Sequence, residues 1–196
     1  MIDLAFALQG GSVPRQHRRA LAAALEQALP WLADVSGAGV HPLNVSAGGG
    51  AEALLSGRTR LTLRVPRSRA DDAARLVGAA LQLGQHSLRV GAMHKRELLP
   101  HGTLYAHLVA DEGADEGAFL RATQAELEAM GVPCRPICGR HQVMAADELQ
   151  GWSLMLDGLS AAGALRVLEA GLGRHRRLGC GVFVPHRSAA AVGTPP

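Results

Sequence analysis

Hydrophobic residues in the first half of the chain follow two repeats, the two-residue repeat of strands and the wider repeat of helices. Leu61, Leu63 and Val65 alternate with polar neighbours, which predicts a strand with one apolar face. Leu21 and Leu25 are four residues apart, which is the spacing of one face of a helix. The elements expected here are, in order, a strand at 2–8, a helix that starts at Pro14 and ends before Pro30, an extended segment at 40–43, a flexible loop at 46–50, a strand at 58–65, a helix at 70–81 and an extended segment at 86–98.

The second half repeats this order of elements. Leu104, Ala106 and Leu108 alternate as in a strand. Gly131 suits the end of a helix and Ser160 the start of one. The expected elements are a strand at 103–110, a helix at 115–130, an extended segment at 135–145, a strand around 152–156, a helix after Ser160 and a strand at 178–185. Two β-α-β-β-α-β units predict an α+β fold of tandem ferredoxin-like (RRM-like) domains, at residues 1–100 and 101–187, followed by a disordered tail at 188–196.

Glycine and arginine are most concentrated just before the last expected strand, at residues 171–187, where the sequence reads GLGRHRRLGCGVFVPHR. Glycine allows the backbone to approach a ligand closely and to offer its N–H groups. An arginine guanidinium can bond two phosphate oxygens at once. This segment therefore predicts a loop that binds a polyanion at the edge of a sheet.

Composition narrows the class of protein. Of the 196 residues 47% are hydrophobic but only 3% are aromatic, so the core must be built from aliphatic side chains. The three cysteines suggest neither a disulfide framework nor a zinc site. The sequence shows neither a leader peptide nor an apolar run of membrane-spanning length. We expect a cytoplasmic, reduced protein without a membrane partner.

Two enzyme classes are disfavoured by the order of residues. Dinucleotide and P-loop motifs run from strand to loop to helix, whereas this glycine-rich loop runs from helix to strand. A metallohydrolase is also disfavoured, because no two histidines and an acid share a ligand-like spacing. We therefore expect neither a cofactor nor a metal.

The glycine-rich segment and several shorter pieces resemble one family. The shorter pieces are Asp3-Leu4-Ala5-Phe6-Ala7-Leu8, Pro14-Arg15-Gln16-His17, Val40-His41-Pro42-Leu43 and Gly139-Arg140. Together they span nearly the whole chain and keep the order of the CRISPR-associated repeat-processing endoribonucleases (the Cas6 family), in particular its myxobacterial branch. The glycine-rich segment resembles the signature loop of that branch.

The resemblance implies a definite reaction. Members of the family bind a hairpin in the CRISPR repeat transcript and cut the pre-crRNA at its 3′ base without a metal ion. A 2′-hydroxyl attacks the adjacent phosphate, which leaves a 2′,3′-cyclic phosphate and a 5′-hydroxyl. Many members stay on the crRNA hairpin as a subunit of a crRNA-guided complex with other Cas proteins. The alternative is a non-catalytic subunit of the same double-ferredoxin group that only holds guide RNA.

Histidine suits the proton transfers of such a reaction near neutral pH, and His17 is the first candidate. It lies four residues before Leu21, at the start of the first expected helix. The positive end of a helix disfavours imidazolium, which would help to keep His17 available as a base. The family commonly has its catalytic histidine in or just after this helix. A histidine that merely ends the apolar stripe is the other interpretation.

His41 is the second catalytic candidate. Pro42 restricts its backbone to an extended conformation, and relatives also use a histidine after the first helix. A structural turn histidine is an equally good interpretation. The sequence leaves open which histidine would be the base and which the acid.

The candidate RNA-binding residues are cations and the glycines among them. They are Arg15, Arg18, Arg19, Arg140, Gly173, Arg174, His175, Arg176, Arg177, Gly179 and Gly181. Bases are often held by stacking on aromatic side chains, of which this chain has very few. Recognition should therefore rest on the shape of the hairpin and on its phosphates, and binding should weaken steeply with salt.

Overall fold

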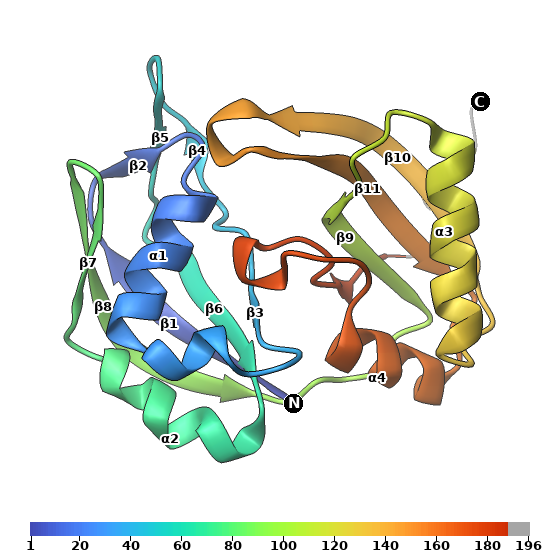
Figure 1. Ribbon diagram of the computed structural model, residues 1–196. Helices are drawn as coiled ribbons and strands as arrows, with labels where there is room; N and C mark the ends of the chain where they lie inside the picture. Colours follow the sequence, from blue (N-terminus) through green and yellow to red (C-terminus); the bar gives the residue numbers. More distant parts are fainter. Residues whose placement is uncertain (188–196) are drawn as a thin grey trace. The chain divides into compact units, whose positions relative to one another are not determined.

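The computed structural model describes residues 1–187 and divides them into two compact units (Figure 1). The first unit holds residues 1–97 together with Arg177–Gly179, and the second holds residues 98–176 and 180–187. Three residues of the glycine-rich segment thus belong to the first unit. The predicted domains at 1–100 and 101–187 were contiguous and placed these residues in the second domain. The expected disordered tail at 188–196 lies outside the described residues.

An antiparallel sheet of five strands forms the base of the first unit, in the order β3-β6-β1-β8-β7. The strands are β1 (Ile2–Gln9), β3 (Gly39–Val40), β6 (Arg60–Val65), β7 (Ala80–Leu83) and β8 (His86–Arg96). The helices are α1 (Arg18–Ala28) and α2 (Ala70–Ala73), with 3-10 turns η1 (Pro30–Ala33), η2 (Arg67–Arg69) and η3 (Ala74–Leu76). A second sheet joins β2 (Ser12–Pro14), β5 (Glu52–Leu54) and β4 (Ser46–Ala47). The order β1-α1-β3-β6-α2-β8 is that of a ferredoxin-like unit and confirms the predicted fold.

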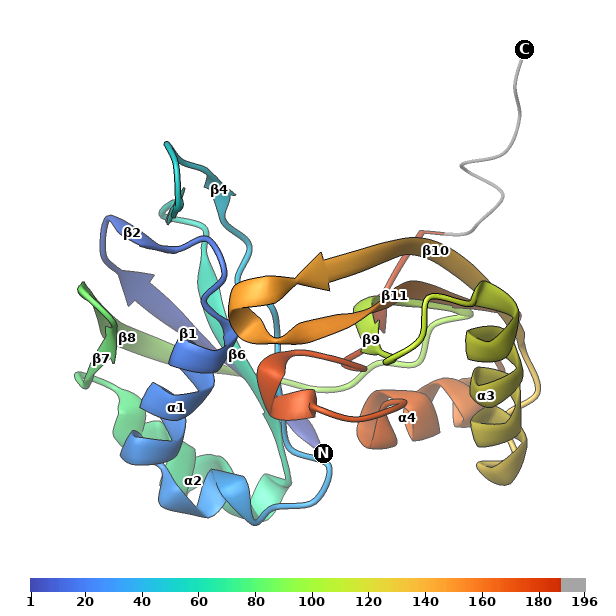
Figure 2. The same cartoon turned by 45° about the horizontal axis from the view of Figure 1, so that its top comes forward.

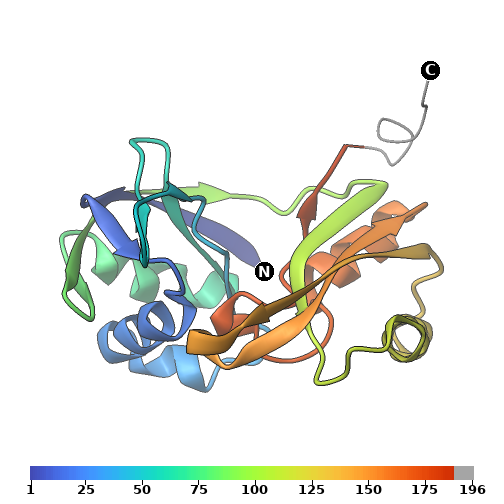
Figure 3. The ribbon, with the colours of Figure 1, turned by 90° about the horizontal axis from the view of Figure 1, so that it is seen from above.

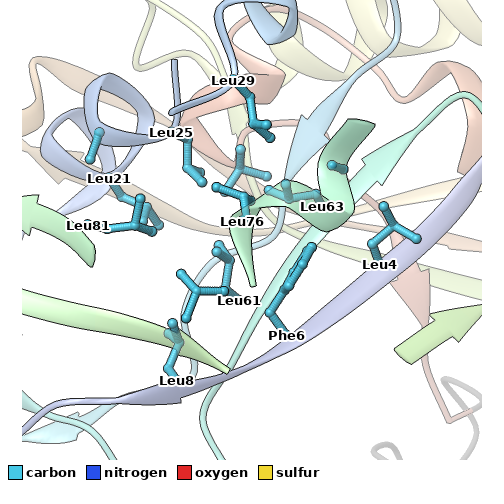
Figure 4. Packing of buried hydrophobic residues seen from close by; sticks show 14 of the residues in the cluster. Leu4, Phe6, Leu8, Leu21, Leu25, Leu29, Leu61, Leu63, Leu76 and Leu81 are labelled. Atoms are coloured by element: carbon cyan, nitrogen blue, oxygen red, sulfur yellow. The ribbon is translucent and has the colours of Figure 1, made fainter. Parts of the chain in front are cut away.

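Both helices of the first unit cover the same face of its sheet (Figure 3). Leu4 and Phe6 of β1 are fully buried there, with Leu61 and Leu63 of the neighbouring β6. Leu25 of α1 packs over them in the same cluster (Figure 4). Each such side chain contributes roughly 1.5–3 kcal/mol through its removal from water. The alternation that predicted these strands therefore also defines the core.

Three local predictions for the first unit are wrong. Pro14 lies in β2, and α1 begins only at Arg18. The expected loop at 46–50 includes a short strand, β4. The expected helix at 70–81 ends early: η3 stops at Leu76, Val77 is extended, and Gly78 then turns the chain with a left-handed conformation (φ 87°). The chain then forms β7, which pairs with β8.

The second unit repeats the ferredoxin-like order. Its elements are β9 (Thr103–Ala110), α3 (Glu116–Ala129), β10 (Arg135–Met144), the 3-10 turn η4 (Ala145–Asp147), β11 (Leu149–Asp157), α4 (Ala161–Ala170), the 3-10 turn η5 (Arg176–Leu178) and β12 (Val184–Pro185). The antiparallel sheet has the order β10-β11-β9-β12, and both helices pack against its strands in one core (Figure 2). Asp115 and Ser160 cap α3 and α4 by accepting bonds from Ala118 N–H and Gly163 N–H.

The last strand is much shorter than predicted. The sequence favoured a strand over 178–185, but β12 contains only Val184 and Pro185. Gly179 and Gly181 both have a positive φ (77° and 62°), so the backbone before β12 cannot stay extended. The apolar residues that suggested a strand are instead buried in an irregular segment, where Phe183 is fully covered.

Membrane spans and metal clusters are both missing from the part of the chain that the structure describes. Among residues 1–187 no helix is long and apolar enough to cross a membrane. In the same residues no three His, Cys, Asp or Glu side chains gather closely enough to hold a metal ion.

Candidate active site

Both predicted catalytic histidines line one small pocket of the first unit. Its walls come from the start of α1, the chain around β3 and the glycine-rich segment: His17, Arg18, Leu21, Val40, His41, Pro42, Leu43, Arg177, Leu178 and Gly179. The pocket is partly open and its volume is about 10 Å³, which is room for roughly one water molecule. A reacting group would therefore meet this site at its surface.

His17 occupies the N-cap position of α1, without a capping hydrogen bond from its side chain, and is only 7% exposed. Its Nδ1 lies 3.0 Å from the carbonyl oxygen of Pro14. A carbonyl oxygen can only accept, so Nδ1 must carry the proton of this bond. The lone pair of the neutral ring is therefore on Nε2, and the adjacent helix N-terminus disfavours a second proton. This arrangement suits a general base.

His41 is held through both its backbone and its ring. Its N–H donates to the carbonyl oxygen of Thr62 in β6 (2.9 Å). Its Nε2 lies 3.4 Å from Oδ1 of Asp3 in β1, an ion-pair distance rather than that of a short hydrogen bond. The side chains of His41 and Asp3 are 12% and 15% exposed. The imidazole therefore sits beside a carboxylate in a largely buried place.

Asp3 is itself fixed by Arg64, which faces it across the β1–β6 ladder. Nε and Nη2 of Arg64 donate to the two carboxylate oxygens at 2.7 and 2.8 Å, and the arginine side chain is 1% exposed. Burial alone would raise the pKa of Asp3. The hydrogen bonds from Arg64 and the proximity of His41 outweigh burial and hold that pKa well below its usual range. Asp3 is thus an anion at any pH near neutrality.

The glycine-rich segment supplies one wall of the pocket. Nη1 of Arg18 donates to the carbonyl oxygens of Leu178 (2.9 Å) and Gly179 (3.0 Å). Arg177 forms an ion pair with Glu26 of α1. A Cβ at Gly179 would press on the guanidinium of Arg18 and the carbonyl oxygen of Val40, and the positive φ of 77° also favours glycine there. Arg18, Arg177 and Gly179, predicted as RNA ligands, hold this wall in place.

Comparison with known proteins decides the family. The family model described as Cas6 Crispr matches residues 2–188. The chain is 38% identical over 194 residues to the CRISPR-associated endonuclease Cas6 of Myxococcus xanthus (strain DK1622), covering 97% of this chain and 84% of that protein. This chain belongs to the Cas6 family. The membership confirms the resemblance drawn from its sequence motifs.

Solved Cas6 structures share the fold. A CRISPR associated protein Cas6 aligns with a TM-score of 0.66 at 13% identity, over 95% of this chain and 99% of that one. An RAMP protein described as binding different RNA substrates aligns at 0.67 with 13% identity, over 93% and 98%. A Cas6-related protein from Pyrococcus furiosus aligns at 0.63 with 12% identity, over 93% and 97%. At such low identity these likenesses speak for the tandem ferredoxin-like fold alone.

In this Cas6 family member the remaining part of the glycine-rich segment belongs to the second unit. Gly173 N–H donates to the carboxylate of Glu126 in α3 (3.0 and 3.1 Å). The guanidinium of Arg176 is buried and lies against Gly171. Gly181 N–H donates to the carbonyl oxygen of Leu108 (2.7 Å). These predicted RNA ligands therefore also have contacts that shape the loop.

The other predicted RNA ligands reach the surface. Arg15, Arg19 and Arg140 are exposed, as are Arg174 and His175 of the loop. Arg15 donates to the carbonyl oxygen of Gly48 (3.2 Å), and Arg174 pairs with Glu112 (2.8 Å). The structure therefore divides the predicted cations into a group that builds the loop and a group that stays accessible.

Asp3 and Arg64 are the site residues that sequence reasoning missed in this Cas6 protein. Asp3 entered the sequence analysis only as part of the resembling motif, and Arg64 only as one of the unnamed polar neighbours of Leu63 and Val65. The signal in the sequence was the opposite charge of Asp3 and Arg64, which lie on two strands that a ferredoxin-like unit places side by side. Strand register, which the sequence does not give, was needed to pair them.

Proposed function

We propose that this protein is a metal-independent endoribonuclease that binds the CRISPR repeat hairpin and cuts pre-crRNA at its 3′ base. The 2′-hydroxyl before the scissile phosphate attacks the phosphorus, and the 5′-oxygen leaves. The products are a 2′,3′-cyclic phosphate and a 5′-hydroxyl. Family membership and the likeness to the Myxococcus xanthus endonuclease support this proposal.

The observation that carries the proposal is the meeting of His17 and His41 on one pocket. The reaction needs a base for the 2′-hydroxyl and an acid for the departing oxygen, and each contributes roughly 10²–10⁴-fold. It also needs cations near the phosphorane, where charge accumulates. Arg18 and Arg177 line the same pocket as the histidines. The pocket thus holds candidates for both proton transfers and for stabilising the phosphorane, although Arg18 and Arg177 also bond the loop and Glu26.

Binding of the repeat RNA is assigned to the accessible cations. Arg15, Arg19, Arg140, Arg174 and His175 are exposed and suit contacts with phosphates. A protein that binds the phosphates of the hairpin can remain bound to the cleaved product, which still contains that hairpin. Retention on the crRNA, as a subunit beside other Cas proteins, is therefore part of the proposal.

A cleavage assay on a repeat hairpin in EDTA tests the proposal. We expect the wild-type protein to cut under these conditions and to leave a 2′,3′-cyclic phosphate, detected by mass spectrometry. His17→Ala and His41→Ala should each lower the single-turnover rate by roughly 10²-fold or more while binding is kept. His86→Ala is the matched control, because His86 bonds Ser12 on another part of the same unit.

Three outcomes would contradict the proposal. A wild-type protein that binds the hairpin and leaves it intact would instead be a subunit that only holds guide RNA. Cleavage that stops in EDTA would overturn metal independence. Normal cleavage rates in both His17→Ala and His41→Ala would show that the pocket is not the catalytic site.

A further inference from the structure

We infer that Asp3 is a positioning residue that holds His41 as the general acid of the cleavage reaction, while His17 serves as its base. The inference rests on the proposed function and deepens it. It assigns the two proton transfers to named rings and adds a carboxylate to the site.

The first step of the argument is the rigidity of Asp3. Its carboxylate receives two hydrogen bonds from Arg64, and the two residues lie opposite each other on neighbouring strands. A buried ion pair pays a large desolvation cost and is weak evidence for stability. Stability alone therefore does not explain this pair. Its position beside the His41 ring suggests that it holds the carboxylate in place for that ring.

The second step is the effect of that carboxylate on His41. A fixed anion beside an imidazole favours the imidazolium form, which is the form that can give a proton. Nε2 is the ring atom that faces Asp3, so proton delivery to RNA would go through Nδ1. The bond from the His41 backbone to Thr62 fixes the chain from which the ring projects.

The charges around His41 leave Asp3 as its counter-charge. The titratable and charged groups that face it are Asp3 from β1, Arg64 from β6, His17 and Arg18 from the start of α1, and Arg177 from the glycine-rich segment. Arg64 is bonded to Asp3, Arg18 points its Nη1 at carbonyl oxygens, and Arg177 pairs with Glu26. Asp3 is the carboxylate within this group.

The third step is the complementary state of His17. Its Nδ1–H is donated to the carbonyl oxygen of Pro14, and the ring sits at the positive end of α1. The helix end opposes a second proton on this ring, whereas the Asp3 carboxylate favours one on His41. Two rings on one pocket thus have environments that push them towards opposite protonation states, which is how acid and base are separated at one pH.

The proton balance of the reaction follows. Nε2 of His17 takes the proton of the 2′-hydroxyl as the oxygen bonds to phosphorus. The bond from phosphorus to the 5′-oxygen breaks, and that oxygen takes the proton from Nδ1 of His41. His17 ends as imidazolium and His41 as neutral imidazole, and exchange with water restores both.

A substrate with sulfur in place of the 5′-bridging oxygen separates these roles. A thiolate leaves without being protonated at neutral pH, because thiols are far stronger acids than alcohols. We expect His41→Ala and Asp3→Asn to cut the all-oxygen hairpin about 10²-fold more slowly than wild type, and to recover to within about tenfold with the 5′-thio substrate. His17→Ala should stay slow with both substrates.

Asp3→Asn takes the carboxylate partner away from buried Arg64, so this variant alone could fail through misfolding. The double variant Asp3→Asn/Arg64→Gln removes both charges together and should show the same recovery. Asp72→Asn is the control, because Asp72 also pairs with arginines, Arg69 and Arg75, rather than with a histidine of the pocket. Its rates with both substrates should match wild type.

Several results would overturn the inference. A deficit of the Asp3 variants that persists with the 5′-thio substrate would mean a purely structural role. Recovery in His17→Ala but not in His41→Ala would reverse the assignment. These results differ from a failure of the proposed function, in which wild type would leave the all-oxygen hairpin uncut.

Discussion

At the scale of single residues, the site depends on charged groups that are buried together. Arg64 is covered by the fold, Asp3 neutralises it, and His41 lies beside the same carboxylate. Removing the carboxylate would leave the buried guanidinium without its counter-charge. The stability of the first unit is therefore linked to the same group that we assign to positioning.

The link makes a prediction about pH. The pKa of Asp3 is depressed in the folded protein, so its ionised form stabilises the fold at pH values above the unfolded pKa near 3.8, and this contribution is lost as pH falls through the folded pKa. At pH 7 we expect Asp3→Asn to lower the free energy of unfolding by about 3–5 kcal/mol, because Arg64 loses its carboxylate partner. Urea titrations at several pH values measure this difference.

The difference should shrink as the pH falls below about 4, because Asp3 of the unfolded wild-type chain then takes up a proton, whereas folded Asp3, with its lowered pKa, stays ionised to lower pH. A constant difference from pH 7 to pH 2 would contradict the linkage. Asp71→Asn is the control, because Asp71 is almost fully exposed and its pair with Lys95 should contribute little.

At the scale of elements, the conformation before β12 is decided by glycine. Gly181 has a φ of 62°, and a Cβ there would overlap the carbonyl oxygen of Leu172. Gly84, in the β7–β8 turn, has the same φ of 62°, but a methyl group added there would meet no described atom within 4 Å. An alanine would have the same unfavourable φ at both positions. Only at Gly181 would its Cβ also overlap another backbone atom.

The pair gives a matched test. Gly84→Ala should cost about 1–2 kcal/mol of unfolding free energy, which is the cost of a left-handed alanine. Gly181→Ala should cost at least about 2 kcal/mol more, because the backbone of the loop must also move. Thermal and urea unfolding measure both changes. Equal costs would show that the close contact with Leu172 relaxes freely.

The same elements explain what the sequence could and could not predict. The ferredoxin-like order follows from residues such as Leu61, Leu63 and Val65, whose alternation reports directly on a half-buried strand. The segments 70–81 and 178–185 were mispredicted because apolar side chains are also buried in irregular chain. The turns in these segments depend on glycines with a positive φ, which periodicity does not reveal. The partnership of Asp3 and His41 depends on contacts between distant strands, which local spacing does not report.

At the scale of the whole molecule, RNA binding should be dominated by electrostatics. With 3% aromatic residues the chain has few stacking platforms, so phosphate contacts must supply much of the affinity. Arg19→Ala and Arg140→Ala should each weaken binding of the repeat hairpin and lower the slope of log affinity against log salt by roughly one.

Fluorescence anisotropy at increasing salt measures this slope. Arg75→Ala is the control, because Arg75 is 81% exposed but lies outside the proposed RNA-binding set. A slope that is unchanged in Arg19→Ala and Arg140→Ala would mean that the hairpin is held by other groups.

The wall of the pocket formed by Arg177–Gly179 has a consequence for how the protein is made. Synthesis proceeds from the N-terminus, and an N-terminal unit generally folds first. Residues 1–97 can form their sheet and core early, but the wall beside His17 and His41 is absent until Gly179 has been added. A nascent chain, or a fragment that stops before residue 177, would carry both histidines and still lack a complete pocket. Under the proposed function, nuclease activity would then begin only after residues 177–179 have been translated.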